Sequence, residues 1–217
     1  MDLIQWLVDF VLHIDEHLTD IISQYGTLTY LILFAIIFCE TGLVVTPILP
    51  GDSLLFAAGA IAAQDDSGLN VLLLAVLLVI AAFTGNLLNY SIGRYFGPKV
   101  FERDYRFIER EYLERTKKFF DKHGAITIVY TRFAPILRTF APFVAGVGQM
   151  SYPRFILYNF IGGFLWIVIF LYAGYFFGNV PFVKENFEAV VLGIILVSLI
   201  PAVYAFIKAR FGKKQAA

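Results

Sequence analysis

Residues 38–53 read FCETGLVVTPILPGDS and place two acids inside an apolar segment. Glu40 and Asp52 would lie about 18 Å apart on one straight helix. The segment between them is interrupted by three helix-breaking residues, Pro47, Pro50 and Gly51. Irregular backbone at membrane depth is stable only where protein or water satisfies its polar groups. The stretch therefore predicts a broken membrane segment that brings both acids to one polar cavity.

The composition of the 217-residue chain is that of a helical membrane protein. Apolar residues make up 59% of the sequence, compared with about 45–50% in soluble domains. Runs long enough to cross a hydrocarbon core of roughly 30 Å recur at residues 68–92, 155–178 and 189–207. We predict a single all-α, polytopic membrane domain.

The distribution of basic residues predicts the orientation of the chain. All 17 lie at or after Arg94, with nine between residues 94 and 122 and four between 208 and 214. By the positive-inside rule, the central loop and the C-terminus face the cytoplasm, and the acidic N-terminal tail faces outside. No Lys or Arg precedes the first apolar residues, so no secretory signal is expected.

This orientation requires residues 25–63 and residues 125–150 each to enter and leave on the same face. The second segment contains Pro135 and Pro142, which we expect to break it as the first is broken. The chain then holds two re-entrant hairpins that enter from opposite faces. Inverted repeats of this kind bind substrates near the midplane, where the broken segments meet.

The remaining segments are predicted to lie outside the membrane core. We expect an outer-face amphipathic tail over residues 1–24 and a basic cytoplasmic tail over residues 208–217. Residues 93–124 predict an amphipathic helix on the cytoplasmic surface, with a solvated helical linker as the alternative.

Four charged residues lie within the predicted hairpins: Glu40, Asp52, Arg132 and Arg138. Each costs about 2.5–3.5 kcal/mol at the bilayer centre, so we expect the two acids and two arginines to pair around a cavity. Two structural alternatives stay open. Asp52 with Ser53 also fits a helix N-cap, and the arginines could hold backbone carbonyls.

Other motifs predict no further chemistry. His13, Glu16 and His17 fit the zinc pattern H-x-x-E-H, but the sequence offers no evident third ligand, so we expect no metal. No cofactor, catalytic residue, enzymatic turnover or nucleic-acid partner is predicted. Trp166 is expected to have only a packing or interface role.

Three stretches together resemble the DedA family of integral membrane proteins, the VTT-domain group. They are ETGLVVTPILPGDSLLFAAGA (40–60), TRFAPILRTFAPFVAGVGQMSYPRF (131–155) and YNFIGGFLW (158–166). The resemblance covers nearly the whole chain. It implies facing re-entrant hairpins, a bacterial inner-membrane location, dependence on the proton gradient and a part in carrier-lipid recycling.

The family's acidic positions match Glu40 and Asp52, and its arginines match Arg132 and Arg138. Relatives often carry an acid in the pattern G-D-x-x-N-Y, where this chain has Asn86 within GNLLNY. Asn86 and Asn89 are still expected to line the cavity.

The function expected from these residues is transport of an anionic lipid headgroup, with undecaprenyl phosphate as the leading substrate and the proton gradient as the driving force. Arginine binds phosphate through two parallel hydrogen bonds, and the acids would carry the protons. The alternatives are a phospholipid scramblase, a proton-coupled antiporter of small cations or drugs, and a non-transporting scaffold. Membrane lipid and protons are the expected partners, and homo-oligomerisation stays open.

Overall fold

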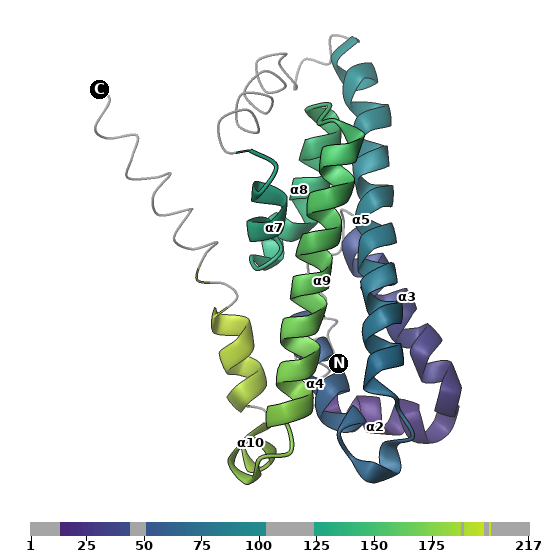
Figure 1. Ribbon diagram of the computed structural model, residues 1–217, viewed down its shortest axis with the longest axis vertical. Coiled ribbons are helices and arrows are strands. Elements are labelled where there is room, and N and C mark those ends of the chain that lie inside the picture. The colour runs from purple at the N-terminus through teal and green to yellow at the C-terminus, as the bar shows by residue number, and fades with distance from the viewer. Residues whose placement is uncertain (1–13, 44–50, 103–123, 188, 198–199, 201–217) are drawn as a thin grey trace, which may run out of the picture. The chain divides into compact units, whose positions relative to one another are not determined.

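The computed structural model describes residues 14–43, 51–102, 124–187, 189–197 and 200, and these residues form helices and turns without a strand. The predicted all-α class is therefore confirmed. Figure 1 shows the helices α2 (Ile14–Tyr25), α3 (Thr29–Gly42), α4 (Gly51–Ala62), α5 (Val71–Glu102), α7 (Thr127–Thr131), α8 (Pro135–Val147), α9 (Tyr152–Phe177) and α10 (Pro181–Glu185).

Several predicted features lie outside the described residues. They are Pro47 and Pro50, the first half of the 1–24 tail, most of the 93–124 surface helix, most of residues 198–207 and the 208–217 tail.

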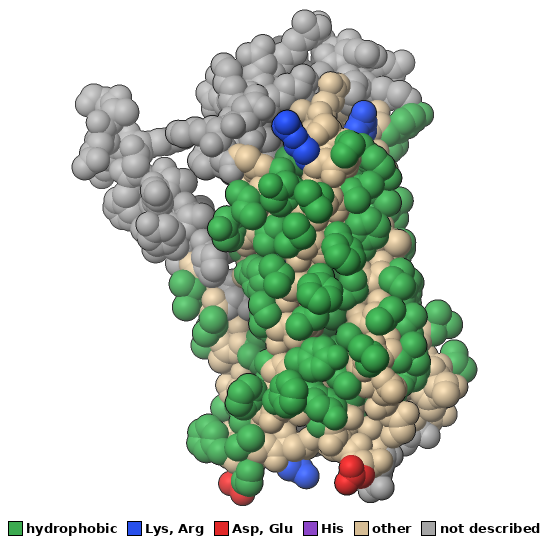
Figure 2. All heavy atoms as spheres, viewed as in Figure 1, with side chains coloured by type: hydrophobic (Ala, Val, Ile, Leu, Met, Phe, Trp, Pro, Cys, Tyr) green, Lys and Arg blue, Asp and Glu red, His purple; other side chains and the backbone are tan. Residues whose placement is uncertain are grey.

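Among the residues that the structure describes, two helices are long and apolar enough to cross a membrane. Val71–Gly97 of α5 has 27 residues and Tyr152–Phe177 has 26, or about 40 Å each at 1.5 Å per residue. Both expose large apolar side chains, and apolar side chains cover much of the face shown in Figure 2. Large exposed apolar surfaces of this kind mark contact with a membrane or a partner rather than with water alone. The exposed residues include Leu72, Leu73, Val76, Ile80, Leu88, Leu157, Phe160, Phe164, Ile169, Phe176 and Phe177.

Helix α5 continues past its predicted end at residue 92 and reaches Glu102. The continuation packs against α8, because a Cβ on Gly93 would meet the Phe143 backbone and one on Gly97 would lie 3.0 Å from the Val147 Cα. The helix therefore extends ten residues beyond the predicted end of the span, and the position at which it leaves the membrane stays a prediction.

The helices α4 and α8 are short. They have 12 and 13 residues, which rise only about 18–20 Å, less than the core of a bilayer. Every residue of α4 is buried. Helix α7 ends at Thr131 and α8 begins at Pro135, because a proline disfavours helical geometry at the residue before it.

The predicted break at Pro142 is wrong, because this proline lies inside α8. An internal proline removes one helical hydrogen bond, and in membrane helices neighbouring groups can compensate for the loss. The helical bond that Pro142 lacks would have gone to the Arg138 carbonyl oxygen, four residues before it. Asn89 of α5 donates from Nδ2 to the neighbouring carbonyl oxygen, that of Thr139, at 2.7 Å.

The chain divides into two compact units, each described by itself. Unit 1 comprises residues 1–36, 48–78 and 165–217, and unit 2 comprises residues 37–47 and 79–164. In unit 1, α4 lies against α9 so closely that a Cβ on Gly59 would meet the carbonyl group of Leu171, and one on Gly174 would meet that of Phe56. In unit 2, α5 and α9 run side by side, with the rings of Tyr90 and Phe155 stacked 4.1 Å apart.

The C-terminal end of α8 carries backbone strain at Gln149, whose φ is 55°. The Met150 amide donates to the Ala145 carbonyl oxygen at 3.0 Å, as in helix ends where the left-handed position usually holds glycine. Left-handed geometry costs a non-glycine residue about 1–2 kcal/mol. We expect Gln149→Gly to raise the melting temperature in detergent and Gln149→Val to lower it. A lower melting temperature for Gln149→Gly would contradict this assignment.

Candidate functional site

A buried ion pair joins two of the predicted charged residues. Glu40 lies in the last turn of α3 and Arg138 in the first half of α8, and their side chains are 1% and 5% exposed. Arg138 donates from Nη2 to Glu40 Oε1 across 98 residues of sequence. Removing one partner of such a pair leaves the other as an uncompensated buried charge. Each of the two residues therefore needs the other to compensate its buried charge.

The second arginine, Arg132, is held by neutral oxygens in the break between α7 and α8. It is 2% exposed, and its Nη2 donates to Asn159 Oδ1 at 2.6 Å and to the Ala82 carbonyl oxygen at 3.3 Å. Gly163 leaves room for the guanidinium, since a Cβ there would lie 3.1 Å from Nη1. The charges of Arg138 and Glu40 both act on Arg132. Three of the four predicted charged residues thus belong to one electrostatic cluster.

Both polar atoms of the Asn159 side chain, in α9, form hydrogen bonds. Its Oδ1 accepts from Arg132, and its Nδ2 donates to the Phe83 carbonyl oxygen at 3.0 Å. Arg132 also binds the backbone carbonyl oxygen of Ala82 in α5. This is the kind of contact expected from the structural alternative, in which the arginines hold backbone carbonyls.

Asn86 and Asn89 line the same region from α5, and both are buried. They lie three residues apart and so share one face of the helix. The Asn86 amide satisfies both of its polar atoms when its nitrogen donates to the Thr41 carbonyl oxygen at 3.2 Å and its oxygen accepts from Arg132.

Asp52 lies in unit 1, in the first turn of α4. Its Oδ1 accepts a hydrogen bond from Trp166 Nε1 at 2.8 Å, and both side chains are buried. As the second residue of the helix, Asp52 is not its N-cap. Gly51 is the first residue of the same helix. The sharing of one cavity by Asp52 and the three charged residues of unit 2 stays a prediction.

Two residues that bind the predicted charged side chains, one in each unit, were missed in the sequence. Asn159 is the only charged or amide residue between positions 155 and 177, which is a usable signal because isolated polar groups in membrane helices need partners. Trp166 was expected to have only a packing or interface role, and in unit 1 its indole N–H has a carboxylate acceptor. An indole N–H normally finds a partner when it is buried.

No metal centre is found in the part of the chain that the structure describes, where no three His, Cys, Asp or Glu side chains gather. The side chains of the cluster offer two kinds of chemistry. Each guanidinium can bind two oxygens of an anion, and the carboxylate of Glu40 can exchange a proton.

Comparison with known proteins places the chain among membrane proteins. Residues 49–176 match the VTT domain. The chain is 53% identical over 218 residues to Protein DedA of Escherichia coli, covering 100% of both chains. It is 44% identical over 171 residues to an uncharacterized membrane protein of Mycobacterium leprae, covering 78% of this chain and 76% of the relative.

It is also 33% identical over 200 residues to the inner membrane protein YghB of Salmonella typhimurium, covering 91% and 87%. No solved structure gave a significant match. The domain match and the full-length similarity together show that this chain belongs to the DedA family of VTT-domain membrane proteins.

Proposed function

We propose that this protein transports an anionic lipid headgroup across the membrane, coupled to the proton gradient, with undecaprenyl phosphate as its substrate. One observation carries the proposal: a buried carboxylate–arginine pair lies within electrostatic reach of a second buried arginine. Such groups are rare in membrane segments and mark substrate or proton pathways.

The chemistry of the cluster suits a phosphate. A guanidinium presents parallel N–H donors that match two phosphate oxygens, and the interaction is stronger away from water. In the structure Arg138 donates to Glu40. Protonation of Glu40 would weaken that bond and release Arg138 for phosphate, with Arg132 as the second donor. Loss of the proton would restore the pair and release the headgroup.

The proposal includes a membrane arrangement. Residues 25–63 and 125–150 would form re-entrant hairpins, because α4 and α8 are too short to span and need protein around their ends. The protein would lie in the bacterial inner membrane with its N-terminus outside and its C-terminus in the cytoplasm, as the distribution of basic residues favours. The lipid tail would stay in the bilayer while the headgroup moves through the polar region.

The structure favours this reading over a cation antiporter. Glu40, the carboxylate that a cation would need in unit 2, is bonded to Arg138. Arg132 adds a second positive charge nearby, so an anion is the better match. Transport needs no bond to be made or broken, and we propose no enzymatic turnover.

Reconstitution into vesicles tests the proposal. Vesicles would carry a fluorescent polyprenyl phosphate, and a phosphatase added outside would report how fast headgroups become accessible under an imposed pH gradient. We expect Arg132→Ala and Arg138→Ala to slow the appearance of accessible headgroups at least about tenfold, since each removes a charge-assisted contact. Arg138→Lys should also be slow, because Lys lacks the planar fork.

Arg154→Gln provides the matched control, because Arg154 is exposed and is absent from the cluster. It should transport at the wild-type rate. Equal rates for wild type and both alanine variants, at equal amounts of folded protein, would rule out the phosphate role. A rate that survives collapse of the pH gradient would show scrambling instead of coupled transport, and proton release driven by cations alone would support an antiporter.

A further inference from the structure

A groove of about 570 Å³ opens on the surface of unit 2, away from the arginine cluster. It is lined by Tyr90, Ser91, Arg94, Tyr95 and Tyr152. The first four come from α5 and the last begins α9. None of the five belongs to the transport site proposed above.

The ends of two apolar stretches lead us to expect this groove at the level of the membrane surface. Arg94 is three residues before Gly97, where the apolar stretch of α5 ends, and Tyr152 is the first residue of the apolar stretch of α9. Tyrosines concentrate at membrane–water interfaces, where their rings meet the lipid headgroups. Tyr95 and Tyr152 are 59% and 44% exposed, so their rings are open to such contact.

The arginine in this groove is held in place by a rigid neighbour. Arg94 Nη1 donates to the Tyr90 hydroxyl oxygen at 2.8 Å, and that hydroxyl donates to the Met150 carbonyl oxygen at 2.5 Å. The Tyr90 ring is stacked on Phe155. A guanidinium has five N–H donors, and among the described residues Tyr90 is the acceptor that the structure gives to Arg94. Most of its donors therefore remain for a ligand.

We propose that this groove binds the phosphate of an anionic glycerophospholipid from the leaflet at that end of α5. Arg94 would take two phosphate oxygens, as an arginine fork does. The tyrosine rings would line the glycerol and the first methylenes of the chains. The site is separate from the proposed transport function, and its occupancy does not depend on Glu40 or Arg138.

Titration of the purified protein with lipid, followed by native mass spectrometry, tests the site. The probes are phosphatidylglycerol and phosphatidylcholine of equal chain length. We expect wild type to bind phosphatidylglycerol at least about tenfold more tightly than phosphatidylcholine, and Arg94→Gln to abolish most of that preference. Because the two lipids are compared within one variant, a partial loss of folded protein does not change the ratio.

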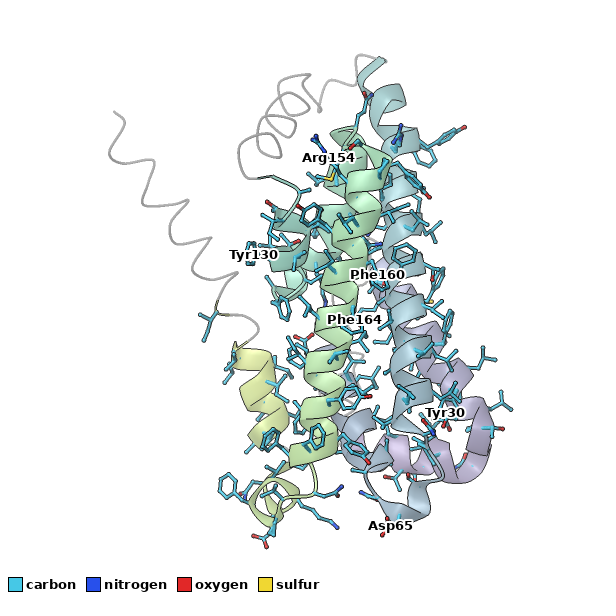
Figure 3. The ribbon with its side chains drawn as sticks, in the orientation of Figure 1. Tyr30, Asp65, Tyr130, Arg154, Phe160 and Phe164 are labelled. Atoms are coloured by element: carbon cyan, nitrogen blue, oxygen red, sulfur yellow. The ribbon has the colours of Figure 1, made fainter. Side chains whose placement is uncertain are left out.

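Arg154→Gln is the control, since Arg154 is exposed at the same end of α9 but does not line the groove (Figure 3). It should keep the preference, as should the double variant Glu40→Gln/Arg138→Gln, which removes the transport cluster. If Arg94→Gln and Arg154→Gln lost the preference for phosphatidylglycerol to the same extent, the preference would come from the overall positive charge of this region. That result would overturn the site. Displacement of phosphatidylglycerol by glycerol 3-phosphate at similar concentration would assign the groove to soluble phosphate esters and overturn the lipid assignment.

Discussion

Glu40→Ala should lower the free energy of unfolding by about 3–5 kcal/mol, because it leaves Arg138 buried without its carboxylate. Arg138 is 6% exposed and Glu40 is 1% exposed, so water cannot replace the lost partner without a change in structure. Reversible unfolding in mixed detergent micelles would measure the difference. A loss below about 1 kcal/mol, the value for an exposed ion pair, would mean that the pair is solvated in the native protein.

A double variant measures the interaction between Glu40 and Arg138 separately from the interactions of each residue with its surroundings. Glu40→Leu/Arg138→Met removes both charges while keeping side-chain volume, and replacing a buried pair by apolar residues is often nearly neutral for stability. We expect the double variant to recover at least half of the loss caused by Glu40→Leu alone. If the losses in unfolding free energy of Glu40→Leu and Arg138→Met added up to that of the double variant, the two residues would be energetically independent.

Asn159→Asp should stop transport while preserving the fold. The change places a carboxylate at the atom that already accepts from Arg132 at 2.6 Å, and an ion pair there would compete with phosphate for the same guanidinium. We expect the transport rate in the phosphatase assay to fall at least about tenfold. The melting temperature should fall only slightly, because the new ion pair with Arg132 offsets the loss of the hydrogen bond from Asn159 Nδ2 to the Phe83 carbonyl oxygen.

Asn186→Asp is the matched control for this change, because Asn186 is exposed and bonds only to the Phe182 carbonyl oxygen among its described neighbours. It should leave the transport rate unchanged. If Asn159→Asp transported at the wild-type rate, Arg132 would have no part in binding the substrate, even if Arg138 did.

The fold class and the broken segments could be predicted because they follow from local chemistry. Long apolar runs specify spanning helices, and Pro135 specifies the end of α7. The Pro142 prediction failed because it treated a proline as a break without regard to its neighbours. Asn89, which donates to the Thr139 carbonyl oxygen in the turn before this proline, comes from a helix 50 residues away, and no local pattern in the sequence indicates this contact.

The members of the site were largely predictable, but their pairing was not. Two acids and two arginines allow several combinations, and the sequence does not choose among them. The structure pairs Glu40 with Arg138 and gives Arg132 to Asn159. That choice depends on how α3, α8 and α9 meet within unit 2, which is a tertiary property. Composition can show that a buried charge needs a partner, whereas only the packing shows which partner it has.

The Asn86 amide has a further consequence. It joins the carbonyl oxygen of Thr41, the residue next to Glu40 in α3, to the guanidinium of Arg132. This link within unit 2 carries no charge of its own. A displacement of the end of α3 that follows protonation of Glu40 would therefore reach the second arginine through one neutral side chain.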